Sequence, residues 1–190
     1  MISAKLVAHT TPTIAVGASN PEEFISYCAR VSNPSNQENY DTAEGLLKYC
    51  IRNKHFSIFE MVNAVVQIKA PRDITRQMLR HRSFSFQEFS QRYSDEIEFC
   101  DREVRMQDKT NRQNSISIDD FYNGPNQFVR DCWDEDVKEI VELVKEHFKD
   151  QRKIGVAKEV ARVLLPEGLT LSTLYANGTL RSWMHYLEVR

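Results

Sequence analysis

The chain has 190 residues and a formal net charge of −2, with 41% apolar and 27% charged residues. These values are ordinary for a soluble globular protein, and the length predicts one domain with a substantial core. A general nucleic-acid binder is normally basic over a whole face, so the near-neutral balance argues against that class and leaves room for a small anionic ligand.

The elements follow from strand alternation, helix caps and helix-period apolar stripes. In the first half of the chain the patterns predict a strand over 2–8, a helix over 21–32, a loop over 33–40, a helix over 42–53, a strand over 61–70 and a helix over 71–82. In the second half they predict a mobile polar loop over 107–119, helices over 125–151 and 155–165, a strand over 169–176 and a final helix from residue 180. Helices outnumber strands and the order is mixed, which predicts an α+β fold, a mixed sheet with flanking long helices, and not a doubly wound one.

Several residues carry these element predictions. Asn20 is predicted to cap the first helix, with Pro21 at the first helical position. Asp41 and Glu44 resemble a capping box at the start of the second helix. Along the longest helix, apolar residues at helical spacing predict one buried stripe. The stripe consists of Val137, Ile140, Val141, Val144 and Phe148.

Targeting segments and metal motifs are not evident. The start, MISAKLVAHTTPTIAVG, lacks the pattern of a signal peptide, and no run of about 18 apolar residues predicts a membrane span. The cysteines form no C-x-x-C pair, which favours buried free thiols in a reducing cytosol over a metal or redox site. We therefore expect a cytoplasmic protein without a metal; the cysteines are Cys28, Cys50, Cys100 and Cys132.

Positive charge is concentrated in 76-RQMLRHRSFSFQEFSQRY-93. Arg72, Arg76 and Arg80 lie four residues apart, so they share one face of the predicted helix, with Asp73 and Glu88 as candidate counter-charges. Five arginines and two acidic residues give residues 71–92 a local charge of +3, so the rest of the chain carries −5.

Two interpretations of this segment remain open. It can be a solvated helix face, as most charge runs are, or a binding site for an anion. Arginine in place of lysine favours the second, because its planar fork suits phosphate oxygens. A glycine-rich phosphate loop is absent from the sequence, so a nucleotide here would rest on arginines and on interleaved polar side chains, namely Gln77, Ser85, Gln87, Ser90 and Gln91.

One motif in this segment resembles a known family. The triplet Arg80-His81-Arg82, followed after seven residues by Ser90, is similar to the signature of the flavin-dependent thymidylate synthases. Further segments resemble the family in the expected order: 28-CARVSNP-34, 55-HFSIFE-60, 159-EVARVLLP-166 and 181-RSWMHYLEVR-190. The resemblance implies a family-specific fold over residues 1–190 and a homotetramer whose active sites lie at subunit interfaces.

The resemblance also implies the chemistry. FAD is the expected cofactor, and the expected reaction converts dUMP to dTMP with methylenetetrahydrofolate as carbon donor and NADPH as reductant through the flavin. Carried over by position, the residues expected to contact FAD are Ser57, Arg80, His81, Arg82, Glu88, Thr179, Arg181 and His185. Those expected to hold dUMP are Gln77, Arg80, Glu88, Ser90, Arg92, Arg162 and Arg190.

Arg190 is the expected catalytic residue, because the resemblance sets it against the uracil ring, where it favours loss of the N3 proton. A fixed guanidinium beside developing negative charge is electrostatic catalysis, which fits a mechanism without a thiol adduct. Ser90 is expected to hydrogen-bond the substrate, with a nucleophilic role as the alternative. His55 is either a structural partner or a residue on the folate or nicotinamide approach. Relatives usually continue beyond the position of Arg190, so we expect the fold to tolerate an end there and activity to depend on the missing segment.

Two rival functions remain. One is a non-catalytic module that binds nucleotides or nucleic acid through the same arginines, and the other is an interaction protein whose basic segment meets an acidic partner. Both predict a colourless protein, whereas the enzyme is expected to be yellow.

Overall fold

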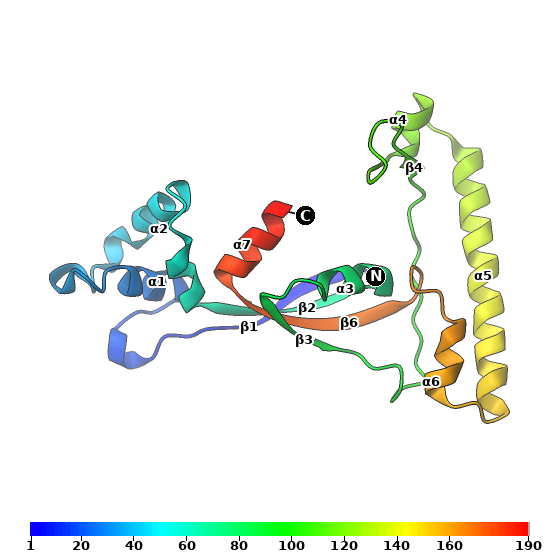
Figure 1. The fold of residues 1–190 in the computed structure, drawn as a ribbon, viewed down its shortest axis with the longest axis horizontal. Helices are drawn as coiled ribbons and strands as arrows, with labels where there is room; N and C mark the ends of the chain where they lie inside the picture. Colours follow the sequence, from blue (N-terminus) through cyan, green and yellow to red (C-terminus); the bar gives the residue numbers. More distant parts are fainter. Residues whose placement is uncertain (190) are drawn as a thin grey trace. The chain divides into compact units, whose positions relative to one another are not determined.

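A computed structural model describes residues 1–189, without the side chain of Ile14. These residues form two compact units. Unit 1 comprises Met1, Pro71–Ile74 and Phe89–Ser172, and unit 2 comprises Ile2–Ala70, Thr75–Glu88 and Thr173–Arg190. A sheet is combined with helices (Figure 1), so the predicted α+β class is confirmed. The single family domain over residues 1–190 stays a prediction.

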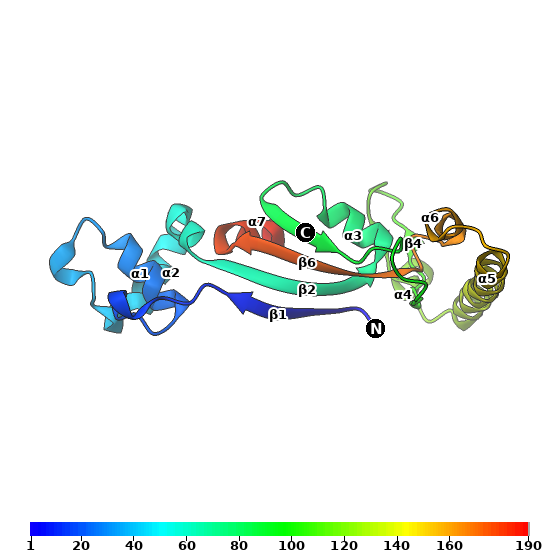
Figure 2. The same cartoon turned by 90° about the horizontal axis from the view of Figure 1, so that it is seen from below.

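The main sheet has four strands in the spatial order β1-β2-β6-β3. Their bounds are Ser3–His9 for β1, Asn63–Pro71 for β2, Phe84–Glu88 for β3 and Leu171–Thr179 for β6. Strand β1 pairs antiparallel with β2, and β3 pairs antiparallel with β6. Figure 2 shows β2 and β6 running along the middle of the sheet, with β1 at one edge. Along β6, Leu174 and Ala176 are fully buried and alternate with exposed Tyr175 and Asn177, as strand geometry requires.

Three of these strands agree with the sequence-based expectation, and β3 does not. The run 80–90 is rich in arginine and polar residues, so the alternation of Phe84 and Phe86 over five residues is a weak signal. The partner strand is β6, far along the chain, and a partner of this kind leaves no trace in local sequence.

The helices of unit 2 pack around one apolar cluster. They are α1 (Pro21–Ala29), α2 (Ala43–Arg52) and α7 (Leu180–Val189), with 3-10 turns at Ile14–Val16, Pro34–Asn36, Tyr40–Thr42 and Phe56–Met61. The predicted cap is confirmed, because the Asn20 side chain accepts a hydrogen bond from Glu23 N at 2.9 Å. The buried members of the cluster are Ile25, Leu47, Cys50, Phe59 and Val62, with Leu180 and Met184 of α7 packed against them.

The predicted capping box at Asp41 and Glu44 is wrong. Helix α2 begins at Ala43, and its cap residue Thr42 makes no side-chain capping bond. The Thr42 hydroxyl instead accepts a hydrogen bond at 2.7 Å from Nη2 of Arg30, which is buried, and Glu44 pairs with Lys48 one turn on. Satisfying the buried guanidinium outweighs the local cap, because an unpaired buried charge is costly.

Unit 1 contains the longest helix, α5 (Gln127–Lys153), with the shorter helices α4 (Ile118–Tyr122), α6 (Lys158–Ala161) and the 3-10 turn Arg162–Leu164. Its apolar cluster is formed by Phe148, Ala161 and Leu165. The predicted buried stripe of α5 is confirmed in part: Phe148 is buried and Val137, Val141 and Val144 are half-buried, whereas Ile140 is 47% exposed. The 3.6-residue period was correct, but a period does not reveal whether a neighbour covers that face.

The stretch 107–119, expected to be a mobile loop, contains a short hairpin and the start of α4. Strands β4 (Met106–Gln107) and β5 (Ser115–Ile116) pair antiparallel. In the turn between them the Asp108 carboxylate accepts hydrogen bonds from Thr110 N at 2.7 Å, Thr110 Oγ1 at 2.8 Å and Asn114 Nδ2 at 2.7 Å. These bonds favour the charged form, so the pKa of Asp108 lies well below its usual range.

The cysteines are free, as expected, but not uniformly buried. Cys50 is buried in unit 2, whereas Cys132 is exposed on α5. Among residues 1–189, no helix combines the length and the apolar character that crossing a membrane requires.

Candidate active site

The basic segment is not one continuous helical face. Helix α3 spans Arg72–Met78 and ends four residues earlier than predicted, so Arg80 lies beyond it. The amide of Arg80 bonds to Gln77 O and that of His81 to Met78 O, two tight turns that reverse the chain toward β3. Arg72 is buried, and its amide donates to Thr170 O at 2.9 Å. The three arginines therefore have separate roles.

Of the two expected counter-charges, Glu88 pairs with an arginine of the basic segment, whereas Asp73 pairs with an arginine outside it. Glu88, at the end of β3, lies 3.4 Å from Arg76 Nη1 and accepts a hydrogen bond from the buried Thr75 hydroxyl at 3.2 Å. Asp73 pairs with both terminal nitrogens of Arg102, a residue outside the basic segment. Glu88 is thus held in place by α3, and only 16% of its side chain is exposed.

Unit 2 contains a cleft of about 750 Å³ at the start of α7. Three residues expected to contact FAD line it: Thr179, Arg181 and His185. The Thr179 hydroxyl caps α7 by accepting from Ser182 N at 3.2 Å, and Arg181 and His185 project from the same helix face, as predicted from their spacing of four. The remaining lining residues are Phe56, Glu60, Met61, Ser83, Ser182, Met184 and Glu188.

The sequence analysis missed Glu60 as part of this cleft. Its carboxylate forms an ion pair with Arg181 across 121 positions of sequence. Met184 both packs against the core of unit 2 and lines the cleft. Leu187 of the same helix is 75% exposed.

An aromatic cluster surrounds His81, which lies two residues before Ser83 of the cleft. The His81 ring meets the Tyr186 ring edge-on at 4.9 Å between centroids, and Phe84 packs against Trp183 at 4.6 Å. The Trp183 indole N–H donates to Ala64 O at 3.1 Å, which fixes α7 to β2. His81 Nε2 is buried and has no hydrogen-bond partner among the described residues. A buried ring nitrogen of this kind is costly unless a ligand or water satisfies it.

Gly178 allows this cluster to form. The predicted strand ended at residue 176, but Asn177 and Gly178 also lie within β6, with Gly178 opposite Phe84. A β-carbon at position 178 would stand 2.5 Å from the Phe84 ring, so only glycine leaves room for the ring.

We expect Gly178→Ala to destabilise the protein by about 1–3 kcal/mol, the usual cost of overpacking a core. Gly168→Ala is the matched control, since nothing lies within 4 Å of a β-carbon there, and it should stay within about 0.5 kcal/mol of the parent. Chemical unfolding of both variants provides the measurement. Equal stability of the two variants would contradict the steric role of Gly178.

Unit 1 carries a second group of predicted residues, those for the substrate. The Ser90 hydroxyl accepts from Arg92 N at 3.3 Å, and Arg92 Nη2 lies 3.1 Å from the Glu159 carboxylate. Arg162 follows on the next turn and donates from Nε to Glu159 O at 3.1 Å. The structure thus brings Arg92 and Arg162 to a common neighbour, Glu159: its carboxylate pairs with Arg92, and its backbone carbonyl accepts from Arg162.

Four of the remaining predicted site residues are exposed to solvent: Ser57, Gln77, Arg80 and Arg82. Ser57 lies on the 3-10 turn that lines the cleft, and Arg82 directly precedes Ser83 of the cleft. His55 packs edge-on against Tyr49 at 6.0 Å between ring centroids. The expected catalytic Arg190 lies outside the described residues.

Comparison with known proteins identifies the family. Residues 5–190 match the family described as thymidylate synthase complementing protein. Over its whole length the chain is 45% identical to a probable flavin-dependent thymidylate synthase of Paramecium bursaria Chlorella virus 1, covering 84% of it. It is 42% identical to the flavin-dependent thymidylate synthase of Synechocystis, covering 85% of that protein. The chain belongs to the flavin-dependent thymidylate synthase family.

Solved structures agree with this membership. The UMP/dUMP methylase PolB of Streptomyces cacaoi, solved with 5-Br UMP, matches 98% of this chain and 75% of its own with a TM-score of 0.75 and 26% identity. The structure of PolB with 5-Br dUMP matches with a TM-score of 0.71 and 28% identity. The predicted family and fold class are therefore confirmed. As a member of this family, the chain is a flavoprotein methyltransferase.

The residues of the cleft fit a flavin nucleotide. The positive end of the α7 dipole and the Arg181 guanidinium suit an anionic diphosphate, and three hydroxyl groups stand beside them. The hydroxyls belong to Ser83, Thr179 and Ser182. His81 is not a lining residue, but it lies two positions before Ser83, and its unsatisfied Nε2 suits a polar edge of a planar ring. The volume of about 750 Å³ lies within the range of ligand pockets.

Proposed function

We propose that the chain converts dUMP to dTMP with bound FAD, methylenetetrahydrofolate as carbon donor and NADPH as reductant. The observation that carries the proposal is the cleft at the start of α7, where Thr179, Arg181 and His185 stand together in a chain of the flavin-dependent thymidylate synthase family. The relatives named above as flavin-dependent thymidylate synthases support the flavin and the thymidylate product.

Atoms and electrons determine what the co-substrates must supply. The methylene carbon has to gain a hydride to become a methyl group, and C5 of the uracil ring loses a proton. Because NADPH is the proposed source of the hydride, the folate leaves as tetrahydrofolate. Bound FAD would supply the redox chemistry that links NADPH to the methylene carbon.

The chain's own residues hold and orient the reactants. Arg92 and Arg162 bind the dUMP phosphate, with the Ser90 hydroxyl as a further donor. Arg181 and the capped α7 N-terminus hold the flavin diphosphate. Glu88, fixed by Thr75 and Arg76, is an acceptor for N–H or O–H groups of the ligands.

Arg190 is proposed to lie against the uracil ring and to stabilise the negative charge that develops there. A planar guanidinium suits this role because it stays charged and offers paired donors. The carbon nucleophile is then activated electrostatically, and no cysteine of the chain is required.

The functional unit is proposed to be a homotetramer with active sites at subunit interfaces. The exposed apolar side chains of α5, with Phe128 76% exposed and Leu143 53% exposed, support an association that covers this helix. The residues predicted to bind dUMP lie partly in unit 1 and partly in unit 2. An active site shared between subunits would allow residues from different chains to complete one binding site.

The visible absorption spectrum of the purified protein tests the function. We expect the spectrum of bound flavin, bleaching by NADPH, and dTMP formation only when dUMP and methylenetetrahydrofolate are both present. A colourless protein that binds nucleotide with steep salt dependence would favour the non-catalytic module instead.

A further inference from the structure

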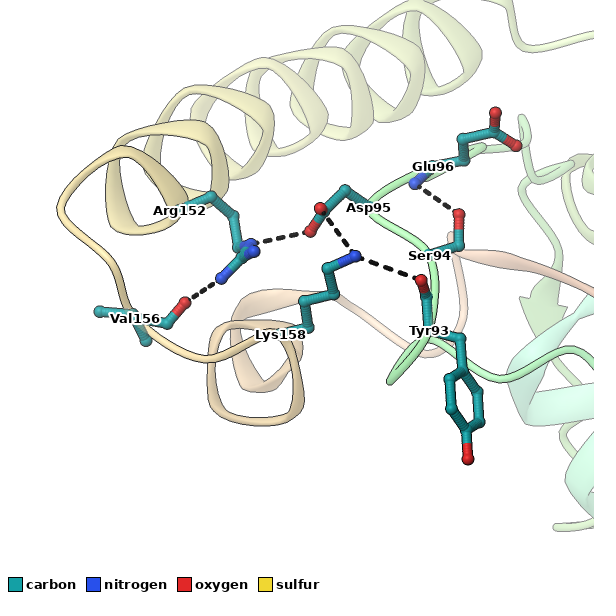
Figure 3. Close-up of polar contacts among 7 residues, drawn as sticks. All are labelled: Tyr93, Ser94, Asp95, Glu96, Arg152, Val156 and Lys158. Atoms are coloured by element: carbon teal, nitrogen blue, oxygen red, sulfur yellow. Dashed lines mark hydrogen bonds and ion pairs between the residues drawn. The ribbon is translucent and has the colours of Figure 1, made fainter.

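The loop after β3, which carries Ser90 and Arg92, is anchored by a compact charge network that the proposed chemistry does not use. Figure 3 shows Asp95 between two cations of different elements, Arg152 at the end of α5 and Lys158 at the start of α6. The Asp95 carboxylate lies 2.7 Å from Arg152 Nε and 3.0 Å from Lys158 Nζ. One carboxylate thus joins three segments of unit 1.

The network reaches the backbone on both sides. Lys158 Nζ also donates to Tyr93 O at 3.2 Å, directly after Arg92, and Arg152 donates to Val156 O in the connection between α5 and α6 (Figure 3). Within the loop, Tyr93 N donates to Ser90 O at 3.2 Å. The loop is therefore held through its backbone at Tyr93 and through its side chain at Asp95.

The same helix that holds the loop also carries the partners of the substrate arginine. Lys158 is followed by Glu159, which pairs with Arg92 at 3.1 Å, and the 3-10 turn after α6 begins at Arg162. Gln91, between Ser90 and Arg92, is buried, with 7% of its surface exposed. The separation of Arg92 and Arg162 thus depends on how the loop is fixed to α6.

From this geometry we propose that Asp95 and Lys158 are positioning residues of the substrate-phosphate site: they hold the loop so that Arg92 and Arg162 can engage one phosphate together. The inference rests on the proposed function, since it assumes that these arginines bind dUMP. Hydrogen bonds from Arg152 and Lys158 hold the pKa of Asp95 below its usual range, so the network stays charged at neutral pH.

Asp95→Asn in the full-length, flavin-loaded protein tests the proposal. The amide keeps the shape of the side chain and removes the charge that joins two cations. We expect KM and Kd for dUMP to rise about three- to tenfold while kcat stays within about twofold, because ground-state positioning is lost and the reacting groups are unchanged. Asp95→Glu should restore most of the dUMP affinity, since it returns the charge.

Asp150→Asn is the matched control. Asp150 forms an ion pair with Lys153 at 2.8 Å at the same end of α5, but that pair joins residues of one helix end and does not reach the loop. This variant should leave dUMP affinity unchanged, and melting temperatures of both variants report any general loss of stability. In Asp95→Asn, hydrogen exchange should also accelerate at the Tyr93 amide and not in α2.

The outcomes separate the two proposals. Weaker dUMP binding in Asp95→Asn alone, with rescue by glutamate, supports the positioning role. Unchanged dUMP affinity in that variant, or an equal loss in Asp150→Asn, overturns the positioning role and leaves the proposed function intact. A parent protein without affinity for dUMP would overturn the proposed function and the inference with it.

Discussion

Replacing Arg181 with alanine is expected to weaken FAD binding about tenfold to a hundredfold, the usual effect of removing one partner of a charged contact. Two effects act in the same direction. The guanidinium that faces the anionic diphosphate is lost, and Glu60, which pairs with Arg181, is left as an uncompensated carboxylate in the same cleft. The purified variant should therefore be pale, and flavin titration followed by fluorescence measures its affinity.

Two further variants show whether the effect is local. Arg52→Ala removes an exposed arginine at the end of α2 and should leave the flavin content at the parent level. Glu60→Gln keeps Arg181 and removes the competing charge, so FAD affinity should be retained or increase. If Arg181→Ala bound FAD as tightly as the parent, the cleft at the start of α7 would not be the flavin site.

Replacing Arg92 with alanine is expected to raise the Kd for dUMP about tenfold to a hundredfold, because a charged and oriented contact to the phosphate is removed. The flavin spectrum should be unaffected, since Arg92 does not belong to the cleft of unit 2. Calorimetric titration with dUMP on the flavin-loaded protein gives the affinity.

Arg112→Ala provides the control for loss of a positive charge in the same unit, since Arg112 is an exposed residue of the β4–β5 turn. It should change dUMP affinity less than about twofold, because exposed charges at a distance are screened by salt. An equal loss in both variants would mean that overall charge, and not the Arg92 contact, holds the phosphate. An unchanged Kd in Arg92→Ala would remove this residue from the substrate site.

The fold was predictable from the sequence where local signals are strong. Alternation over 61–70 and the Asn20 cap lead directly to β2 and α1. The prediction failed at β3 and at the capping box, because in both places the deciding contact comes from a distant residue. Phe84 lies opposite Gly178 of β6, and the Thr42 hydroxyl accepts a hydrogen bond from Arg30. The amphipathic pattern of α5 was real, although Ile140 on its apolar face is 47% exposed.

The candidate site shows the same division. The spacing of Arg181 and His185 placed both on one face of α7 from sequence alone. Glu60, which pairs with Arg181, could not be found in this way because 121 residues separate the two. Glu88 was correctly anticipated as a counter-charge, whereas its support by Thr75 depends on the turn between α3 and β3. The assignments of individual residues to FAD or dUMP stay predictions.

A crystal structure of the protein with both FAD and dUMP tests the central claim most directly. We predict the flavin in the cleft at the start of α7, in contact with Arg181, His185 and His81 Nε2, and the dUMP phosphate between Arg92 and Arg162. Ligands bound elsewhere, with these side chains turned toward solvent, would contradict the account.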